Sequence, residues 1–231
     1  MATHQTLSGV SDEEFVQRIA STHPERFGAD FWAVFEAHIA PALPSDPVVI
    51  DLGCGPGLLL RDLGIRYPQA RLYGYDVTPA MIAYAQQLPI SRNKPALAVL
   101  DVATAPLPHE PGTVDLVTMN SVLHVLDEPL PVLAEIRRVL APQGIFLLHD
   151  WIRMPLQAYL AWRLERQGEG LEACRQRGFR LFPVHCKYTV EDWQWLLNEA
   201  GFAIRYQASL RPTHRVFVTT PTPSDAGRGR G

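Results

Sequence analysis

The stretch Val48-Val-Ile-Asp-Leu-Gly-Cys-Gly-Pro-Gly57 reads as a buried strand that runs through a glycine-rich turn into the start of a helix. Its glycines at positions 53, 55 and 57 let the backbone turn tightly and let a ligand approach backbone amides at a helix N-terminus. The spacing is G-x-G-x-G, whereas the dinucleotide fingerprint is G-x-G-x-x-G, and Leu58 stands where its last glycine would fall. We therefore predict a cofactor loop that does not bind a pyrophosphate.

Acidic residues end three consecutive predicted strands. Asp51 precedes the glycines, where its charge would repel a pyrophosphate but favour a ligand with an ammonium and a sulfonium group. Asp76 ends the next strand, where a carboxylate can accept hydrogen bonds from both hydroxyls of a ribose. Asp101, with Val102 after it, ends the third strand and can accept from the amine of an adenine, to which Val102 offers an amide. These positions predict a cofactor with a ribose, an adenine and a cationic end.

Outward from this stretch, short apolar runs alternate with longer amphipathic ones, which is the pattern of an α/β sheet. The predicted parallel strands are Val48–Asp51, Arg71–Asp76, Ala96–Asp101, Val114–Met119 and Gly144–Asp150. The predicted helices between them are Gly57–Arg66, Pro79–Gln87 and Glu128–Leu140. Ligands bind outside the carboxyl ends of such strands, so one crevice should be lined by Asp51, Asp76, Asp101, Asn120 and Asp150.

The C-terminal part adds a helix and two strands. Thr189 and Asp192 resemble a capping box at the start of a helix over Val190–Ala200. The runs Phe202–Leu210 and His214–Thr219 are separated by a short turn, which predicts an antiparallel pair at the sheet edge.

The stretches VVIDLGCGPG, LYGYDVTPAMIAYA and LDVATAPLP, in this order, resemble class I S-adenosylmethionine-dependent methyltransferases. The resemblance covers about Val48–Asp150 and implies a Rossmann-like seven-stranded mostly parallel sheet with an antiparallel last strand and helices on both faces. It implies S-adenosylmethionine as the methyl donor, held at its methionine end by Asp51 and the glycine loop, at its ribose by Asp76 and at its adenine by Asp101. By the same resemblance the cofactor-binding residues are Asp51, Gly53, Cys54, Gly55, Asp76, Val77, Met81, Asp101, Val102 and Asn120.

Two histidines near strand ends are candidate catalytic bases. His124 follows the fourth predicted strand, and His149 lies at the end of the fifth, beside Asp150. A neutral imidazole could accept a proton from a hydroxyl or amine acceptor. Either histidine could instead be a packing residue, and period-two alternation allows only one of His149 and Asp150 to face the crevice directly.

Two segments lie outside the predicted sheet, and they divide the chain into parts. We predict an N-terminal helical cap at residues 1–44, a donor-binding domain at 45–219 with an inserted lid at 151–187, and a disordered tail at 220–231. The lid carries seven basic and three acidic residues, and its net charge of +4 leaves −7 for the rest of the chain. Solvated helix faces or recognition of an anionic substrate group would each explain this charge.

The net charge, the apolar runs and the cysteine spacing argue against several classes of protein. The chain of 231 residues has a net charge of −3, so no global positive field favours nucleic acid, and no apolar run approaches the length of a membrane span. The N-terminus lacks a secretion signal and the three cysteines have no metal-type spacing, which predicts a cytoplasmic protein with free thiols and no metal site. The oligomeric state stays open.

The leading hypothesis is a methyltransferase for a small-molecule acceptor, one that could carry an anionic group. A nucleic-acid or protein amino-group methyltransferase is disfavoured, because the chain reads Asn120-Ser-Val-Leu where [DN]-P-P-[FY] would be expected. The alternatives are a non-catalytic protein that binds S-adenosylmethionine or S-adenosylhomocysteine, and a dinucleotide-dependent oxidoreductase.

Overall fold

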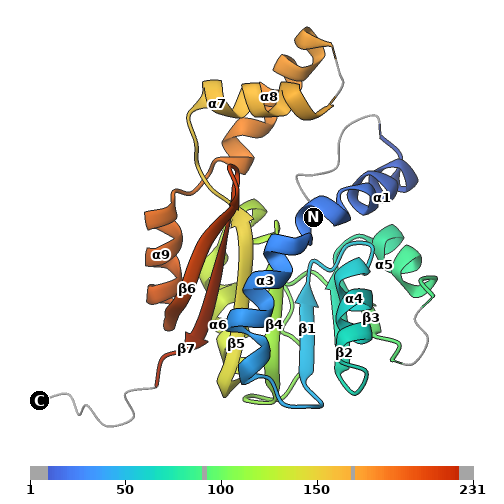
Figure 1. Cartoon of the computed structure of the whole chain (residues 1–231), viewed down its shortest axis with the longest axis vertical. Helices are drawn as coiled ribbons and strands as arrows, with labels where there is room; N and C mark the ends of the chain where they lie inside the picture. Colours follow the sequence, from blue (N-terminus) through green and yellow to red (C-terminus); the bar gives the residue numbers. More distant parts are fainter. Residues whose placement is uncertain (1–9, 90–92, 168–169, 224–231) are drawn as a thin grey trace, which may run out of the picture.

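The computed structural model of the chain describes residues 10–89, 93–167 and 170–223. In these ranges seven strands form one sheet in the order β3-β2-β1-β4-β5-β7-β6 (Figure 1). The first five strands pair in parallel, and β7 runs antiparallel to both β5 and β6. The strands are β1 Val48–Leu52, β2 Arg71–Asp76, β3 Ala96–Val99, β4 Val114–Asn120, β5 Leu140–Trp151, β6 Phe202–Arg211 and β7 His214–Pro221. The predicted mostly parallel sheet with an antiparallel last strand is confirmed.

Helices cover both faces of the sheet because its central strands are apolar on both faces. One buried cluster joins the sheet to α6 Pro129–Val139 and α9 Val190–Glu199. A second cluster, on the other face, joins it to α3 Ala29–His38, α4 Leu58–Arg66 and α5 Pro79–Gln86. Of the helices in the described ranges, none is long and apolar enough to cross a membrane.

Two helices begin with reciprocal capping hydrogen bonds. At α9 the Asp192 amide donates to Thr189 Oγ1 at 3.1 Å, and the Thr189 amide donates to Asp192 Oδ2 at 2.8 Å, which confirms the predicted capping box. Ser11 and Glu14 form the same arrangement at α1 Asp12–Ser21. Each box satisfies backbone donors that have no partner inside the helix, so the sequence fixes where these helices start.

Several predicted boundaries were wrong. Strand β3 ends at Val99, and Asp101 lies in the turn after it, where its side chain accepts from the Ala103 amide at 3.0 Å. Strand β5 starts at Leu140, earlier than predicted, directly after α6. Strand β7 runs to Pro221, so ordered structure continues past the predicted start of the tail at 220, and residues 224–231 lie outside the described residues.

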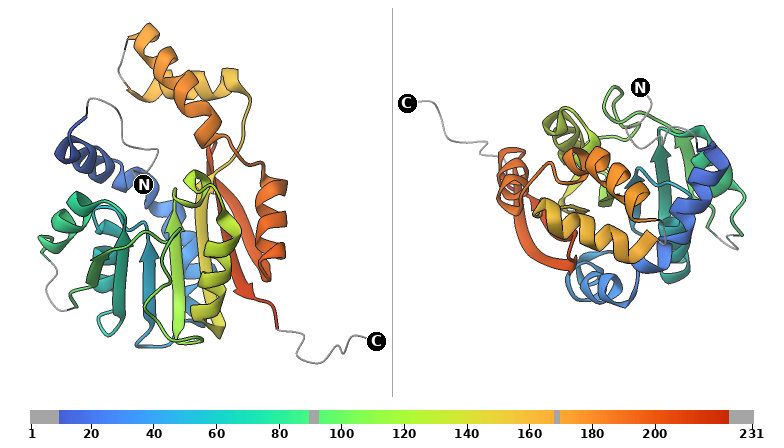
Figure 2. Two further views of the ribbon diagram at one scale, coloured as in Figure 1. Left: turned by 180° about the vertical axis from the view of Figure 1, so that it is seen from behind. Right: turned by 90° about the horizontal axis from the view of Figure 1, so that it is seen from above.

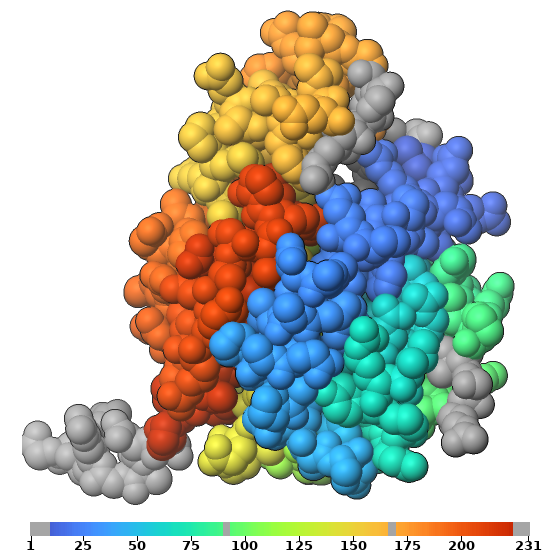
Figure 3. Space-filling view, in the orientation of Figure 1, coloured from blue at the N-terminus to red at the C-terminus, as the bar shows by residue number. Residues whose placement is uncertain are grey.

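Helices α1 and α2 His23–Arg26 of the cap and both helices of the lid lie at the carboxyl edge of the parallel strands, whereas α3 of the cap packs on a face of the sheet (Figures 1 and 2). The described part of the cap contains α1, α2 and α3, and the lid contains α7 Leu156–Gln167 and α8 Leu171–His185. Figure 3 shows the lid above the β6–β7 hairpin with the cap beside them. The arrangement places both segments where a ligand of the strand ends would be covered.

Candidate active site

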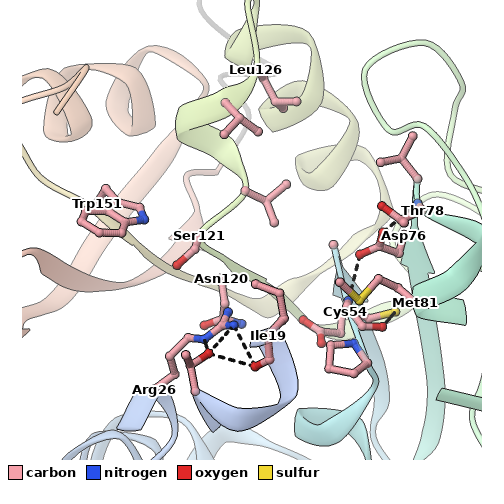
Figure 4. Close-up of a pocket in the computed structure, with 18 of the residues that line it drawn as sticks. Ile19, Arg26, Cys54, Asp76, Thr78, Met81, Asn120, Ser121, Leu126 and Trp151 are labelled. Carbon is pink, nitrogen blue, oxygen red and sulfur yellow. Dashed lines mark hydrogen bonds between the residues drawn. The ribbon is translucent and has the colours of Figure 1, made fainter. Parts of the chain in front are cut away.

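A cavity of about 750 Å³ lies between the carboxyl edge of the sheet, the cap and the lid (Figure 4). All ten residues that the sequence assigns to the cofactor line it: Asp51, Gly53, Cys54, Gly55, Asp76, Val77, Met81, Asp101, Val102 and Asn120. The structure therefore brings these residues together, and their binding of a cofactor stays a prediction.

The glycine loop needs glycine at two positions for steric reasons. Gly53 has a φ of 67°, and a Cβ there would collide with the side chain of Val122 in the loop after β4. Gly57 has a φ of 73°, and a Cβ there would lie 2.7 Å from the Cβ of Ala85 in α5. The loop is held to β2 by the Gly53 amide, which donates to the Tyr75 carbonyl at 2.7 Å. The loop backbone thus stays close to the cavity with no side chain in between.

Asp76 is oriented by backbone hydrogen bonds. Its Oδ2 accepts from the Gly55 amide at 2.9 Å and its Oδ1 accepts from the Thr78 amide at 2.8 Å (Figure 4). Burial raises the pKa of Asp76, and the two backbone hydrogen bonds act against that rise. Each carboxylate oxygen keeps a lone pair for a further donor, so Asp76 can accept from two ligand hydroxyls.

Asp51 is buried at the end of β1 with one close side-chain partner. The Thr118 hydroxyl donates to Asp51 Oδ1 at 2.6 Å. The pKa of Asp51 is raised to about 7, chiefly by burial and also by the charge of Asp76, while Thr118, Asn120 and Arg26 oppose the rise. A cationic ligand group in the cavity would favour the ionised form of this carboxyl.

Asn120 and Ser121 mark the end of β4 in the cavity. Asn120 is 7% exposed, and neither polar atom of its side-chain amide has a hydrogen-bond partner. Ser121 has a φ of 57°, a backbone conformation that residues other than glycine rarely adopt. Residues with this conformation cluster at functional sites. Its hydroxyl shares a hydrogen bond of 3.1 Å with His214 Nε2. A buried amide without partners is costly, so Asn120 is suited to bind a ligand.

Within the described residues, five arginines line the cavity. Two come from the lid, two from the cap and one from the end of β6: Arg163, Arg177, Arg18, Arg26 and Arg211. Sequence reasoning identified the basic lid but missed Arg18, Arg26 and Arg211, because each stands alone in the sequence and only the fold brings them together. We call the ends of β1 to β3 with their carboxylates the acidic side of the cavity, and the cap, lid and β6 segments with their arginines the arginine side, to which Glu25 of the cap adds a carboxylate.

Aromatic side chains form a wall between the lid and the β6–β7 hairpin. The Trp151 ring stacks on His185 with centroids 3.9 Å apart, and the Tyr159 hydroxyl lies 2.8 Å from His185 Nδ1. Burial lowers the pKa of His185 to about 2 and that of His214 well below its usual value. Both imidazoles are thus neutral near pH 7, and this wall is flat and largely apolar.

His124, the first candidate base, pairs with a buried carboxylate. His124 Nδ1 lies 2.6 Å from Asp150 Oδ1, and both side chains are fully buried. Neither residue is among those that line the cavity, so the expectation that Asp150 faces the crevice was wrong. Asp150 instead accepts hydrogen bonds from the backbone of His124 and Trp151 because it is enclosed between β5 and the turn Leu123–Val125.

His149, the second candidate base, also lies outside the set of residues that line the cavity. Its ring packs between Phe31 and His214, with centroid distances of 6.1 and 5.3 Å. Burial, together with the charges of Arg211 and Arg26, lowers the pKa of His149 to about 3. The structure thus leaves His149 neutral and enclosed.

The segment that contains the ends of β1 to β3 matches a known protein domain. Residues 50–148 match the family model described as a methyltransferase domain. A malonyl-(acyl-carrier protein) O-methyltransferase of Hahella chejuensis is 34% identical over 128 residues, which are 55% of this chain and 43% of that protein. A trans-aconitate 2-methyltransferase of Methylobacterium nodulans is 40% identical over 96 residues, which are 42% of this chain and 35% of that protein. The chain thus spans less than half the length of these two relatives.

The fold as a whole is also similar to solved structures. A SAM dependent methyltransferase from Aquifex aeolicus superposes with a TM-score of 0.64 and 19% identity, covering 91% of this chain and 98% of that one. At this identity the likeness is one of fold. The matched residues 50–148 contain the ends of β1 to β3, whereas all five cavity arginines lie outside them.

Proposed function

We propose that this chain, which belongs to the class I S-adenosylmethionine-dependent methyltransferase family, transfers a methyl group to a small-molecule acceptor that carries an anionic group. One observation carries the proposal: a single cavity is lined both by the carboxylates at the ends of β1 to β3 and by five arginines of the cap, the lid and β6. The strand-end carboxylates suit a cationic donor, and the arginines suit an anionic acceptor.

The residues of the acidic side fit S-adenosylmethionine group by group. Asp51 and the glycine loop would hold the ammonium and the methionine chain, and Asp76 would accept from the two ribose hydroxyls. Asp101 and Val102 would bind the adenine edge, with Met81 against its ring. The bound donor supplies a methyl group on a positively charged sulfur, which a nucleophile can take up directly.

Alignment and exclusion of water are the tasks left to the protein. The cap and the lid both line the cavity, for example through Ile19 and Leu181, so an acceptor held there is shielded from solvent. Holding two reactants in line can supply a large part of the rate enhancement without a strong base. The roles of His124 and His149 as bases stay predictions, because neither lines the cavity as the structure stands.

The names of the two relatives agree with an acidic acceptor. Both describe transfer to an organic acid or its derivative, a malonyl group in one and trans-aconitate in the other. These names belong to those proteins, and they support here only the class of a small anionic molecule.

Calorimetry with Asp76→Ala tests the donor site. We expect wild type to bind S-adenosylhomocysteine in the micromolar range and NAD(H) much more weakly. Asp76→Ala should lose at least about 1.5 kcal/mol of binding, or roughly tenfold in affinity, because two ribose hydroxyls lose their acceptor. Asp46→Ala, in an exposed loop, is the matched control.

Two results would contradict the proposal. Tighter binding of NAD(H) than of S-adenosylhomocysteine would favour an oxidoreductase. Binding of S-adenosylhomocysteine without any transfer of label from S-adenosylmethionine to a metabolite extract would favour a non-catalytic binding protein.

A further inference from the structure

Two arginines from opposite ends of the chain meet in the cavity. Arg26 ends α2, and its guanidinium plane is fixed by hydrogen bonds from Nε and Nη2 to Thr22 Oγ1 at 3.0 and 2.8 Å. Arg211 ends β6, and its side chain is 13% exposed. Arg211 Nη1 lies 3.5 Å from Glu25 Oε1, and the Glu25 side chain is 43% exposed. We call Arg26 and Arg211 the arginine pair.

The arginine pair brings two positive charges together next to the carboxylates of Glu25 and Asp51. Burial, with the charge of Arg211, lowers the pKa of Arg26 to about 10, so Arg26 still carries a charge near pH 7. His149 and His214, which face the pair from β5 and β7, are neutral because burial lowers the pKa of each. Asp51 and Glu25 are the carboxylates that act on Arg26. Two like charges held close together at half-buried positions repel each other, and an anion bound between them would relieve that repulsion.

A third group beside the pair is ready to bind a ligand. Asn120 lines the same cavity as Arg26 (Figure 4), and within the described residues neither polar atom of its amide has a hydrogen-bond partner. Guanidinium groups and an amide N–H are the donors that a carboxylate prefers, because its two oxygens accept several hydrogen bonds. The aromatic wall of Trp151 and His185 lies on the lid side and could pack against the body of such a molecule.

We propose that the arginine pair binds a carboxylate of the acceptor and that an oxygen of this carboxylate is the atom that is methylated. This inference rests on the proposed function and names its acceptor class, a carboxylic acid converted to a methyl ester. Asp51 places the cationic end of the donor beside Asn120 and Arg26, so the donor methyl and the bound carboxylate belong to neighbouring parts of the cavity.

The reaction balances without a proton. A carboxylate oxygen forms a bond to the methyl carbon, the carbon–sulfur bond breaks, and its electron pair stays on sulfur, which gives neutral S-adenosylhomocysteine and a neutral ester. A carboxylate is already ionised near pH 7, so no base has to remove a proton. This agrees with a cavity in which the lining histidines His185 and His214 are hydrogen-bonded and neutral, while the third, His23, is bonded to Asp62 at 2.8 Å. The ester has lost its charge, so the arginine pair holds the product less tightly than the acceptor.

The arginine pair has a second candidate ligand. The methionine end of the donor also carries a carboxylate. Two ligands distinguish this carboxylate from that of the acceptor. S-Adenosylhomocysteine has the amino-acid carboxylate, and 5′-methylthioadenosine has the same nucleoside without it.

The first experiment identifies the bond that is formed. The full chain is incubated with methyl-labelled S-adenosylmethionine and either a deproteinised bacterial metabolite extract, malonate or trans-aconitate, and the products are treated with alkali. Methyl esters release labelled methanol, whereas methyl ethers, amines and thioethers do not. We expect alkali-labile label in at least one mixture. Label that resists alkali in every mixture overturns the inference but leaves the methyltransferase assignment intact, and no transfer at all overturns both.

The second experiment assigns the residues. Arg26→Gln and Arg211→Gln should each lower the rate of alkali-labile labelling by about 10- to 100-fold, as expected for loss of a charge-assisted hydrogen bond. Affinity for S-adenosylhomocysteine should change less than about threefold, which also shows that each variant folds. Arg205→Gln, on the exposed side of the same strand β6, is the matched control and should label like wild type.

Three results would overturn the assignment. Unchanged labelling in both variants removes the arginine pair from the reaction. A tenfold loss of S-adenosylhomocysteine binding with unchanged 5′-methylthioadenosine binding assigns that arginine to the donor carboxylate instead. If a glutamine variant binds neither ligand, Arg26→Lys and Arg211→Lys decide, because lysine keeps the charge but not the planar fork. Labelling at the wild-type rate by both lysine variants would then exclude bidentate binding.

Discussion

Burial raises the pKa of Asp51 to about 7, so in the free protein this carboxyl gains and loses its proton near neutral pH. Binding of the donor ammonium favours the ionised carboxylate. We therefore expect the affinity for S-adenosylhomocysteine to rise between pH 6 and pH 8, approaching tenfold per pH unit on the acid side. Calorimetry across this range measures the slope.

The variant Asp51→Asn is the control for that slope. It keeps the shape of the side chain and an oxygen that can accept from Thr118, but it cannot titrate. Asp76, whose pKa burial also raises, remains in the variant and would account for any slope that is left. A variant that binds weakly but with the full wild-type pH dependence would contradict the role of Asp51.

His124 is expected to act through Asp150 rather than on the acceptor. His124→Ala leaves a fully buried carboxylate without its imidazole partner, which should cost about 3 kcal/mol of stability. Labelling at a temperature where the variant is folded should fall less than about fivefold, and His124→Asn should recover part of the stability by donating to Asp150. A loss of 10² to 10⁴ in rate, with unchanged stability and S-adenosylhomocysteine binding, would instead identify a general base.

The residues that could be predicted from the sequence are those next to a local signal. Asp51, Asp76 and Asp101 each end or follow an apolar strand run, and the glycine loop marks the first of them. Arg26 and Arg211 have no such neighbour, because a single arginine at the end of a short helix or strand is ordinary in any sequence. Only the packing of the cap against the β6–β7 hairpin gives these two residues a shared position.

At the scale of elements, helices with capping signals and strands with continuous apolar runs were predicted well. The errors lie where local chemistry was ambiguous. The stretch Ala141-Pro-Gln-Gly144 looks like a turn, yet β5 already runs through it from Leu140, beside a register irregularity between Val114 and Leu116 in β4. Proline is tolerated in a strand at such an irregularity.

The cap and the lid are expected to respond to ligand together. Side chains of α1 and α8 line the cavity, including Ile19, Leu181 and His185, so a ligand that fills it adds contacts to both helices. Hydrogen exchange should show protection of α1 and α8 with S-adenosylhomocysteine plus an acceptor. Helices α6 and α9, on a face of the sheet away from the cap, serve as the internal reference. Protection confined to the glycine loop would contradict this coupling.

At the scale of the whole molecule, the two sides of the cavity come from different parts of the chain. The donor side lies within residues 50–148, the segment that matches the methyltransferase family. The arginine side comes from the cap, the lid and the β6–β7 hairpin, which lie on both sides of that segment in the sequence. Sequence similarity to relatives therefore supports the identity of the methyl donor, whereas the class of the acceptor is inferred from the geometry of the cavity.

The lid leaves and rejoins the body of the protein at neighbouring points. The Arg153 amide donates to the Tyr188 carbonyl at 2.6 Å, so the two ends of the lid lie within a few residues of one shared hydrogen bond. A segment with adjacent ends can be lengthened, shortened or exchanged without altering the spacing between β5 and α9. Gene duplication followed by replacement of residues 151–187 could thus give enzymes that share one donor site and accept different molecules, and the same junction is a natural place to graft a new lid in the laboratory.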